Sequence, residues 1–336
     1  LGSMDWTSLC NLRCQHCFVS CAGSKRDELT TVQMKSVLSN LADHGLLFLV
    51  ITGGEPLSRP DFRELYRYAK SLGFILTIFT NATLVDDDMA AFLAENPPRR
   101  LEATVYGHTE QTYETVTGIP GSFRRFRDGV NALLRNRLLV RFKTMVMECN
   151  KREFREMKAW AEALGAEFRY DALLHGRLNG DLSSTRHRIP PDEVARLNFL
   201  NADDRTAFLR RRKEVGRRMP PRKTLFECGA GTMTLHVDAH GQAHVCMLWR
   251  NDPYDLLSKP LDGQFLEHVR NVRNRPAPDG PCSVCADREL CNYCPPVALL
   301  ETGHPARPSA YFCRLAAERK LQSRRSSRET SRRLKK

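Results

Sequence analysis

The twelve cysteines of this 336-residue chain gather in two regions instead of being spread along it. Cys10, Cys14 and Cys17 lie within eight residues of one another, and seven more cysteines lie between Cys228 and Cys313. No apolar segment near the N-terminus resembles a secretory signal, so we expect the reducing cytoplasm as the compartment. In that compartment, dense cysteines bind metals more often than they form disulfides. The cysteine pattern therefore predicts a chain that folds around metal sites.

Composition excludes several other classes of protein. Hydrophobic residues make up 41% of the chain, which is a globular value, and no run approaches the ~18–20 apolar residues needed to cross a bilayer. The net charge is +13, but residues 318–336 hold nine Lys or Arg and two Asp or Glu, so this run alone contributes +7. It lacks interleaved aromatic residues, and we therefore expect neither a nucleic-acid nor a membrane partner. Residues 317–336 are predicted to be a basic disordered tail.

Short apolar runs alternate with helical patterns over the first half of the chain. Apolar residues recur at helical spacing over residues 62–72 and 154–164, and Gly73 and Gly165 follow as helix stops. Such alternation predicts an α/β fold with a parallel sheet and helices outside it, either open or curled into part of a barrel. The expected strands are Met4–Leu9, Leu47–Ile51, Phe74–Phe79, Leu101–Tyr106, Leu138–Met147 and Phe168–Leu174.

The pattern changes after residue 174 and suggests a division into domains. Leu1-Gly2-Ser3 before Met4 is interpreted as a cloning scar and left out of the fold. The cysteine-rich region that follows the linker is too poor in periodic elements to build a large core, so metal is expected to hold it together. We expect residues 1–4 to be the scar and start, 5–180 a partial (β/α)6 TIM-like barrel, 181–224 a helical linker, 225–316 a small cysteine-rich domain and 317–336 the tail.

The first cysteine cluster has the spacing C-x3-C-x2-C and follows the first expected strand. Three thiolates in one loop can hold three irons of a cubane cluster and leave the fourth iron open, or they can belong to a structural zinc site. Spacing alone does not separate the two. The second expected strand ends in Gly53-Gly54-Glu55-Pro56, at the edge of the sheet where β/α folds place their sites.

At these residues the chain resembles the radical S-adenosylmethionine (SAM) enzymes, over roughly 170 residues. The resemblance implies that Cys10, Cys14 and Cys17 hold a [4Fe–4S] cluster whose open iron binds SAM. The cluster then cleaves SAM reductively to a 5′-deoxyadenosyl radical, which abstracts hydrogen from a substrate. The same resemblance implies cofactor contacts for Gly53, Gly54, Glu55 and Pro56 at the methionine amine, His16 against adenine, and Asn81, Thr104 and Lys143 at the ribose or carboxylate.

The second cysteine region contains two C-x2-C pairs, which on their own are typical of a zinc ribbon. Its seven cysteines in this order also resemble the SPASM extension of radical SAM enzymes, which binds auxiliary [4Fe–4S] clusters. Two departures are present: the second pair has two intervening residues where three are usual, and Thr234 lies near the point where some members carry another cysteine. The second departure implies an open iron site in one cluster. The resemblance assigns Cys282, Cys285, Cys291 and Cys313 to one auxiliary cluster and Cys228, Cys246 and Cys294 to the other.

SPASM enzymes mostly modify peptides, so the resemblance implies a ribosomally made precursor peptide as substrate. It implies a crosslinking, thioether-forming, epimerising or excising reaction, with a flavodoxin or ferredoxin as reductant. Because the barrel begins at the cysteine loop, we expect a separate leader-recognition protein or direct docking. The alternatives are a dehydrogenase or oxidase of a small metabolite, a maturase that forms formylglycine in a sulfatase, an RNA-modifying enzyme, and a non-enzymatic metal scaffold.

Two cysteines and one loop are left without a cofactor role. Cys21 and Cys149 are interpreted first as unreactive thiols. Cys149 follows the long fifth strand, and we hypothesise that it donates a hydrogen atom to a substrate radical, as an epimerase requires. The loop from His175 to Arg188 follows the sixth strand, and we expect a solvated loop there in preference to a lining of the substrate opening.

Overall fold

The computed structural model describes residues 1–19, 28–200 and 220–333, and the side chains of all of these except Glu289 and residues 324–333. Within these ranges nine strands form one sheet, in the order β6-β5-β4-β3-β2-β1-β7-β8-β9. Neighbours from β6 through β7 are parallel, whereas β8 and β9 continue the sheet in antiparallel. The strands are β1 Gly2–Asp5, β2 Phe48–Thr52, β3 Ile75–Thr80, β4 Arg100–Thr104, β5 Val140–Met145, β6 Glu167–Asp171, β7 Leu235–Val237, β8 Gln242–His244 and β9 Tyr254–Asp255.

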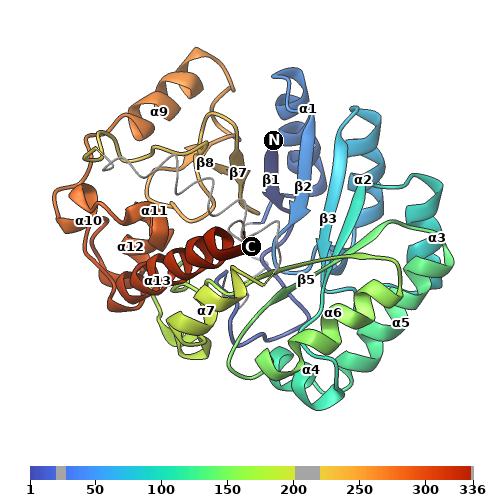
Figure 1. Ribbon diagram of the computed structural model, residues 1–336. Coiled ribbons are helices and arrows are strands. Elements are labelled where there is room, and N and C mark those ends of the chain that lie inside the picture. Colours follow the sequence, from blue (N-terminus) through green and yellow to red (C-terminus); the bar gives the residue numbers. More distant parts are fainter. Residues whose placement is uncertain (20–27, 201–219, 334–336) are drawn as a thin grey trace.

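Six helices alternate with the parallel strands among the described residues and cover the outside of the sheet (Figure 1). Helix α2 explains why: its buried residues Phe62, Leu65, Tyr66 and Ala69 recur at helical spacing, so one stripe of the helix faces the sheet. Short polar side chains begin other helices, as where Thr30 forms a capping box at α1. The helices are α1 Thr31–Asp43, α2 Phe62–Ser71, α3 Asp87–Glu95, α4 Glu110–Thr117, α5 Ser122–Arg135 and α6 Phe154–Ala163.

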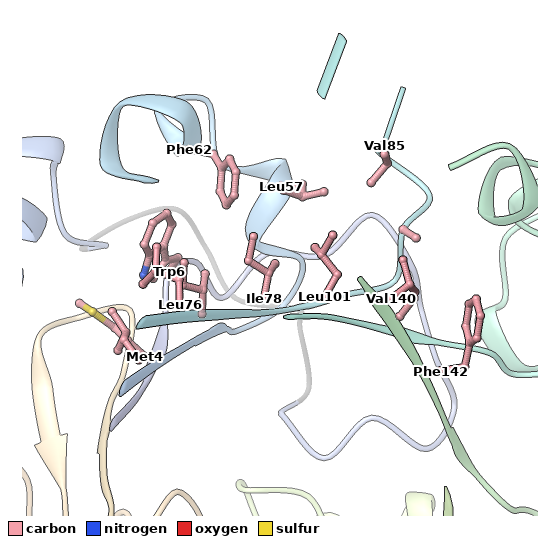
Figure 2. Close-up of a cluster of buried hydrophobic side chains, with 14 of the residues drawn as sticks. Met4, Trp6, Leu57, Phe62, Leu76, Ile78, Val85, Leu101, Val140 and Phe142 are labelled. Atoms are coloured by element: carbon pink, nitrogen blue, oxygen red, sulfur yellow. The ribbon is translucent and has the colours of Figure 1, made fainter. Parts of the chain in front are cut away.

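The main core lies between the outer face of the sheet and these helices. Alternate residues of β3 and β5 are buried, as expected for strands with one face against helices. Figure 2 shows Ile78 and Leu101 pointing from the sheet toward Leu57 and Phe62. Each fully buried side chain of this size contributes about 1.5–3 kcal/mol to stability. This core fixes the strands whose carboxyl ends carry the predicted site residues.

The C-terminal region continues the same sheet instead of folding as a separate body. Strand β7 lies beside β1, with Gly2 opposite Leu235 and Met4 opposite Val237, and the helices of this region gather on that side of the molecule (Figure 1). Helix α13 packs against α7 and α11. These helices are α7 Pro191–Leu197, α9 Gly263–Arg273, α10 Pro281–Val284, α11 Arg288–Cys291, α12 Pro295–Thr302 and α13 Ala310–Arg333; short 3-10 helices span Pro56–Ser58, Lys151–Glu153 and Ser183–His187.

The partial barrel and the cysteine-rich C-terminal region agree with the predicted fold class, and most strand bounds differ by one to three residues. The exclusion of residues 1–3 from the fold is wrong, because Gly2 and Ser3 lie in β1 and pair with both β2 and β7. The first strand therefore spans Gly2–Asp5 and not Met4–Leu9.

The expected disorder after residue 316 is also not observed, because α13 continues through Arg333. Its Ala, Leu, Lys, Arg and Glu residues favour helix, and its first turns are docked on α7. Part of the expected helical linker, residues 201–219, lies outside the described residues. No helix in the described ranges is both long and apolar enough to cross a membrane.

Candidate active site

The cysteine loop leaves the carboxyl end of β1 and brings three thiols together. Cys10, Cys14 and Cys17 are all half-buried. Burial raises the pKa of the Cys14 thiol well above its usual range, and the neighbouring Cys17 and Cys10 raise it further. The backbone N–H of Leu12 donates to Cys10 Sγ at 3.4 Å, and the Tyr106 hydroxyl donates to Cys14 Sγ. The loop thus presents three thiols with hydrogen-bond donors already directed at two of them.

The Gly-Gly-Glu-Pro turn is bonded directly to this loop. The N–H of Gly54 donates to Thr7 O and that of Glu55 donates to Leu9 O, each at 2.8 Å. Gly53 has a φ of +125°, and a Cβ on Gly54 would lie only 1.9 Å from Leu9 O. Any side chain at either glycine would therefore separate the turn from the loop. The two glycines hold the strand end against the segment that carries the first cysteine.

The Glu55 carboxylate is buried and bonded to the end of the next strand. It accepts hydrogen bonds from the Thr80 hydroxyl at 2.8 Å, from Asn81 N at 2.7 Å and from Leu57 N at 3.2 Å. Burial raises the pKa of Glu55 to about 7, against the opposing effect of these donors and of Lys143. Glu55 therefore fixes the ends of β2 and β3 to one another.

Thr104 and Lys143 occupy paired positions on β4 and β5. The Lys143 ammonium lies 3.2 Å from the centroid of the Phe79 ring and 3.9 Å from the Glu102 carboxylate. Burial lowers the pKa of Lys143 to about 7, although Glu102 and Glu55 act in the opposite direction. The structure thus buries Lys143 beside Phe79 and Glu102, within electrostatic range of Glu55. Thr104 ends its strand and is half-buried.

His16 lies in a group of aromatic rings beside the cysteines. Its ring packs edge-on against Tyr106 at 5.0 Å, and Tyr106 packs against Tyr113 at 5.7 Å. Burial lowers the pKa of His16 to about 4, with further effects of His187 and Arg177, so the imidazole is neutral at pH 7. His16 Nδ1 and the Tyr113 hydroxyl are buried and have no hydrogen-bond partner among the residues that the structure describes.

Tyr106 and Tyr113 were not predicted as site residues, because an aromatic residue at a strand end or on a helix face is typical of a core. In the structure burial raises the pKa of Tyr113, and the charges of Cys14 and Glu55 raise it further, while its ring packs against Tyr106 at 5.7 Å. A buried hydroxyl without a partner is costly, so it is a position at which a bound polar group would be stabilised. The spacing of tyrosine, cysteine and glutamate in the sequence gave no signal for this.

The loop from His175 to Arg188 packs over the cysteine loop at two points. Leu178 N donates to Phe18 O at 2.9 Å, and the Arg177 guanidinium donates to Gln15 O at 3.3 Å. Asn179 is exposed, as a solvated loop would be. The loop is thus partly packed and partly solvated, and its packed part lies beside the predicted cofactor residues.

Arg188, at the end of this loop, joins the barrel to the C-terminal region. It donates twice to Leu174 O, at 2.9 and 2.7 Å, and forms a buried ion pair with Glu301 of α12. Its guanidinium also lies over the rings of Tyr311 and Phe312, at 4.5 and 5.1 Å.

Cys149, in contrast, is exposed in the turn after β5, and the adjacent Glu148 N donates to His187 O at 3.0 Å. Cys21 lies outside the described residues.

The seven C-terminal cysteines separate into two groups. Burial raises the pKa of Cys294 to about 11, and the nearby Cys246 and Cys228 thiols add to the shift. Burial likewise raises the pKa of Cys282 to about 11, with further effects of Cys291, Cys313 and Cys285. The groups are therefore Cys228, Cys246 and Cys294, and Cys282, Cys285, Cys291 and Cys313.

Asn292 explains why Cys291 and Cys294 join different groups although only two residues separate them. Its backbone is left-handed, with a φ of 56°, and reverses the chain between α11 and α12. Cys291 ends α11, whereas Cys294 is the residue that precedes α12. The zinc-ribbon interpretation needs these two thiols in one quartet, and the structure instead brings Cys294 to Cys228 and Cys246.

The comparison with family models identifies the N-terminal half. Residues 4–161 match the radical SAM superfamily model. These residues belong to the radical SAM superfamily. Enzymes of this superfamily use SAM with a [4Fe–4S] cluster.

The curated relatives fall into two functional groups. AdoMet-dependent heme synthase of Methanosarcina barkeri is 32% identical over 167 residues, which are 49% of this chain and 48% of that protein. Mycofactocin maturase MftC of Mycobacterium ulcerans is 24% identical over 321 residues, covering 90% of this chain and 84% of the maturase. The chain thus spans about half the length of this haem synthase and most of the length of the maturase.

Solved structures show the same fold. Streptococcus suis SuiB bound to S-adenosylmethionine has a TM-score of 0.68 at 16% identity, covering 93% of this chain and 77% of SuiB. Native anSMEcpe with bound AdoMet has a TM-score of 0.70 at 15% identity, covering 99% of this chain and all of that one. Both similarities extend through the C-terminal region.

The donor set at the barrel edge fits a [4Fe–4S] cluster and SAM. Three thiols in mutual electrostatic contact are the ligands that a cubane with one open iron requires. Among the described residues, no three His, Cys, Asp or Glu side chains converge on a point suited to a single metal ion. The unpartnered His16 Nδ1 and Tyr113 hydroxyl supply buried polar positions for an organic cofactor.

Proposed function

We propose that this radical SAM enzyme modifies a ribosomally synthesised peptide by hydrogen abstraction. When bound, the cluster and SAM supply a 5′-deoxyadenosyl radical. The division of the seven C-terminal cysteines into a group of four and a group of three is the observation that carries the proposal, because it favours auxiliary iron–sulfur clusters over a zinc ribbon. The proposed domain boundaries stay at residues 180, 224 and 316 within one continuous sheet, and the barrel begins at Gly2 in β1.

The residues of the barrel edge take separate roles in this proposal. Cys10, Cys14 and Cys17 hold the cluster, and Gly53 to Pro56 present backbone groups to the SAM amine. Lys143 is placed to pair with the SAM carboxylate, since it is buried and within electrostatic range of Glu55 in the predicted site. Thr104 lies opposite it on β4 and contributes a hydroxyl. His16 and Tyr113 supply ring surface and a buried hydroxyl to the rest of the cofactor, which keeps water from it.

The C-terminal groups would hold the two auxiliary clusters. Cys282, Cys285, Cys291 and Cys313 form a complete four-thiolate set. Cys228, Cys246 and Cys294 supply three thiolates, which leaves one iron open to substrate. Buried arginine supports an anionic cluster here: Arg319 of α13 is 3% exposed, donates to Asn198 Oδ1 and Leu290 O, and lies within electrostatic range of Cys291.

A peptide substrate is supported by the nearly full-length similarity to the mycofactocin maturase and by SuiB, whose structure has also been solved with its precursor peptide SuiA. A tetrapyrrole is the second candidate, because AdoMet-dependent heme synthases are among the relatives and one of them is similar over 88% of this chain. Small-metabolite oxidation and formylglycine formation stay open as further reactions.

The test uses anaerobically reconstituted enzyme with SAM and a low-potential reductant. We expect about twelve irons per chain, 5′-deoxyadenosine as product, and deuterium transfer into it from a labelled precursor peptide. About four irons would contradict the auxiliary clusters. Deuterium transfer from an iron-tetrapyrrole or a small metabolite, with none from peptides, would contradict the substrate class while leaving the radical chemistry intact.

Two further parts of the proposal concern partners and Cys149. A flavodoxin or ferredoxin would supply electrons, since its acidic surface suits a mildly basic enzyme, and a separate protein would present the leader of the precursor peptide. Cys149 would donate a hydrogen atom to the substrate radical. Turnover by a Cys149→Ala variant at the wild-type rate, with the same product stereochemistry, would remove this thiol from the mechanism.

A further inference from the structure

Asn81 lies where β3 ends and joins the three motifs of the barrel edge. Its side-chain amide nitrogen is 3.8 Å from Cys10 Sγ and 2.9 Å from Asn11 Oδ1. Its carbonyl oxygen accepts from Thr83 N at 2.9 Å and from the Thr83 hydroxyl at 2.6 Å. Its backbone N–H donates to Glu55. The residue is 7% exposed, so these hydrogen bonds are made in the protein interior.

These contacts use the whole hydrogen-bonding capacity of the Asn81 side chain. A primary amide has two N–H donors and two acceptor lone pairs. One donor is directed at Asn11 and the other at the Cys10 sulfur, while both lone pairs accept from Thr83. No donor or acceptor remains for a ribose hydroxyl, which is the role that the family resemblance implies for this position.

The surroundings also keep the amide from turning toward a ligand. Asn11 Nδ2 donates to the Thr83 hydroxyl at 2.7 Å, which closes a ring of hydrogen bonds around Asn81. The next residue, Ala82, is fully buried with a φ of 60°, and its carbonyl oxygen would lie 2.0 Å from a Cβ on Gly129 of α5. Helix α5 therefore packs directly against the turn that carries Asn81.

A hydrogen bond to a cluster thiolate stabilises the state with more negative charge and raises the reduction potential. We propose that Asn81 is a positioning residue of the Cys10 thiolate that sets the potential of the catalytic cluster, and that it does not contact the SAM ribose. The inference rests on the proposed role of Cys10, Cys14 and Cys17 as cluster ligands.

The experiment compares Asn81→Ala with Thr83→Val in the full-length holoenzyme. Thr83→Val breaks the same ring of hydrogen bonds but leaves the amide donor on Cys10, so it controls for loss of the network. An EPR-monitored redox titration follows the cluster signal that changes when SAM is added, and SAM affinity is measured separately. Iron content and wild-type SAM cleavage report on the proposed function independently of either variant.

For Asn81→Ala we expect the ratio of reduced to oxidised cluster at a fixed potential to fall about tenfold, equivalent to 59 mV for a one-electron couple. SAM affinity should change less than twofold, and Thr83→Val should match wild type in potential. An unchanged potential would overturn the inference, and a tenfold loss of SAM affinity alongside it would indicate the ribose contact instead. An equal shift in Thr83→Val would do the same.

A second measurement decides the matter if Asn81→Ala does not assemble its cluster. Wild-type enzyme labelled with ¹⁵N-asparagine is reduced, and pulsed EPR records hyperfine coupling between the SAM-responsive cluster and the label. A coupling from an asparagine side-chain nitrogen supports the inference, and its absence contradicts it. A wild-type enzyme without any SAM-responsive cluster would instead refute the proposed function.

Discussion

Replacing Gly54 by alanine should separate the cysteine loop from the strand that supports it. The new Cβ would lie 1.9 Å from Leu9 O and 2.4 Å from Leu9 C, so the two backbones must move apart by about 1 Å or more. That movement breaks two hydrogen bonds, Gly54 N to Thr7 O and Glu55 N to Leu9 O. Each is worth about 0.5–1.5 kcal/mol and the overpacking costs about 1–3 kcal/mol, so we expect a loss of about 2–6 kcal/mol.

The effect on chemistry should be larger than the effect on folding. A displacement of about 1 Å near reacting groups can lower a rate about 100-fold, so we expect at least that loss in 5′-deoxyadenosine formation. Gly263→Ala is the matched control, because no atom lies within 4 Å of its Cβ position at the start of α9. Urea unfolding, iron content and SAM cleavage are compared for both variants. Wild-type cleavage by Gly54→Ala, with full iron content, would refute the steric argument.

Three further substitutions test other parts of the structure. Cys294→Ser should lower iron content by about four per chain and leave the SAM-responsive cluster signal intact; loss of about eight would contradict two separate groups. Tyr113→Phe should weaken SAM binding by about tenfold, as expected for one lost hydrogen bond, whereas Tyr66→Phe, which removes a hydroxyl bonded to a remote backbone carbonyl, should leave it unchanged in a titration. Arg188→Ala should lower the free energy of unfolding by about 3–5 kcal/mol in urea, because it leaves the buried Glu301 unpaired; a change below about 1 kcal/mol would show that the pair contributes little.

The β/α order and the two glycines were predictable because their signals are local. Hydrophobic periodicity marks each strand and helix, and Gly53-Gly54 follows a buried run at the position where a sheet edge is expected. The pairing of β1 with β7 could not be predicted from the sequence. It joins residues more than 230 positions apart, and neither strand is long enough to show a hydrophobic pattern. The C-terminal part of α13 was predicted to be disordered because of its basic composition, although its residues also favour helix.

The structure brings the predicted site residues to one edge of the sheet, while their cofactor roles stay predictions. The triad and the Gly-Gly-Glu-Pro turn were found because their residue types are chemically specific. Asn81 lies at the end of β3 as expected, yet its hydrogen-bond partners Asn11 and Thr83 have no distinctive spacing relative to it. Tyr106 and Tyr113 face the thiols only because β4 and α4 bring them there, and nothing in the sequence separates such tyrosines from core residues.

The pairing of β1 with β7 has a consequence for how the chain reaches its native state. Until β7 is synthesised, one edge of β1 has unpaired backbone groups, and the cysteine loop follows directly from that strand. Closing this contact requires a loop of more than 230 residues, which makes the step slow relative to the local β/α units. A ribosome-bound or truncated barrel ending before Leu235 should therefore expose an unpaired strand edge beside the cysteine loop and aggregate.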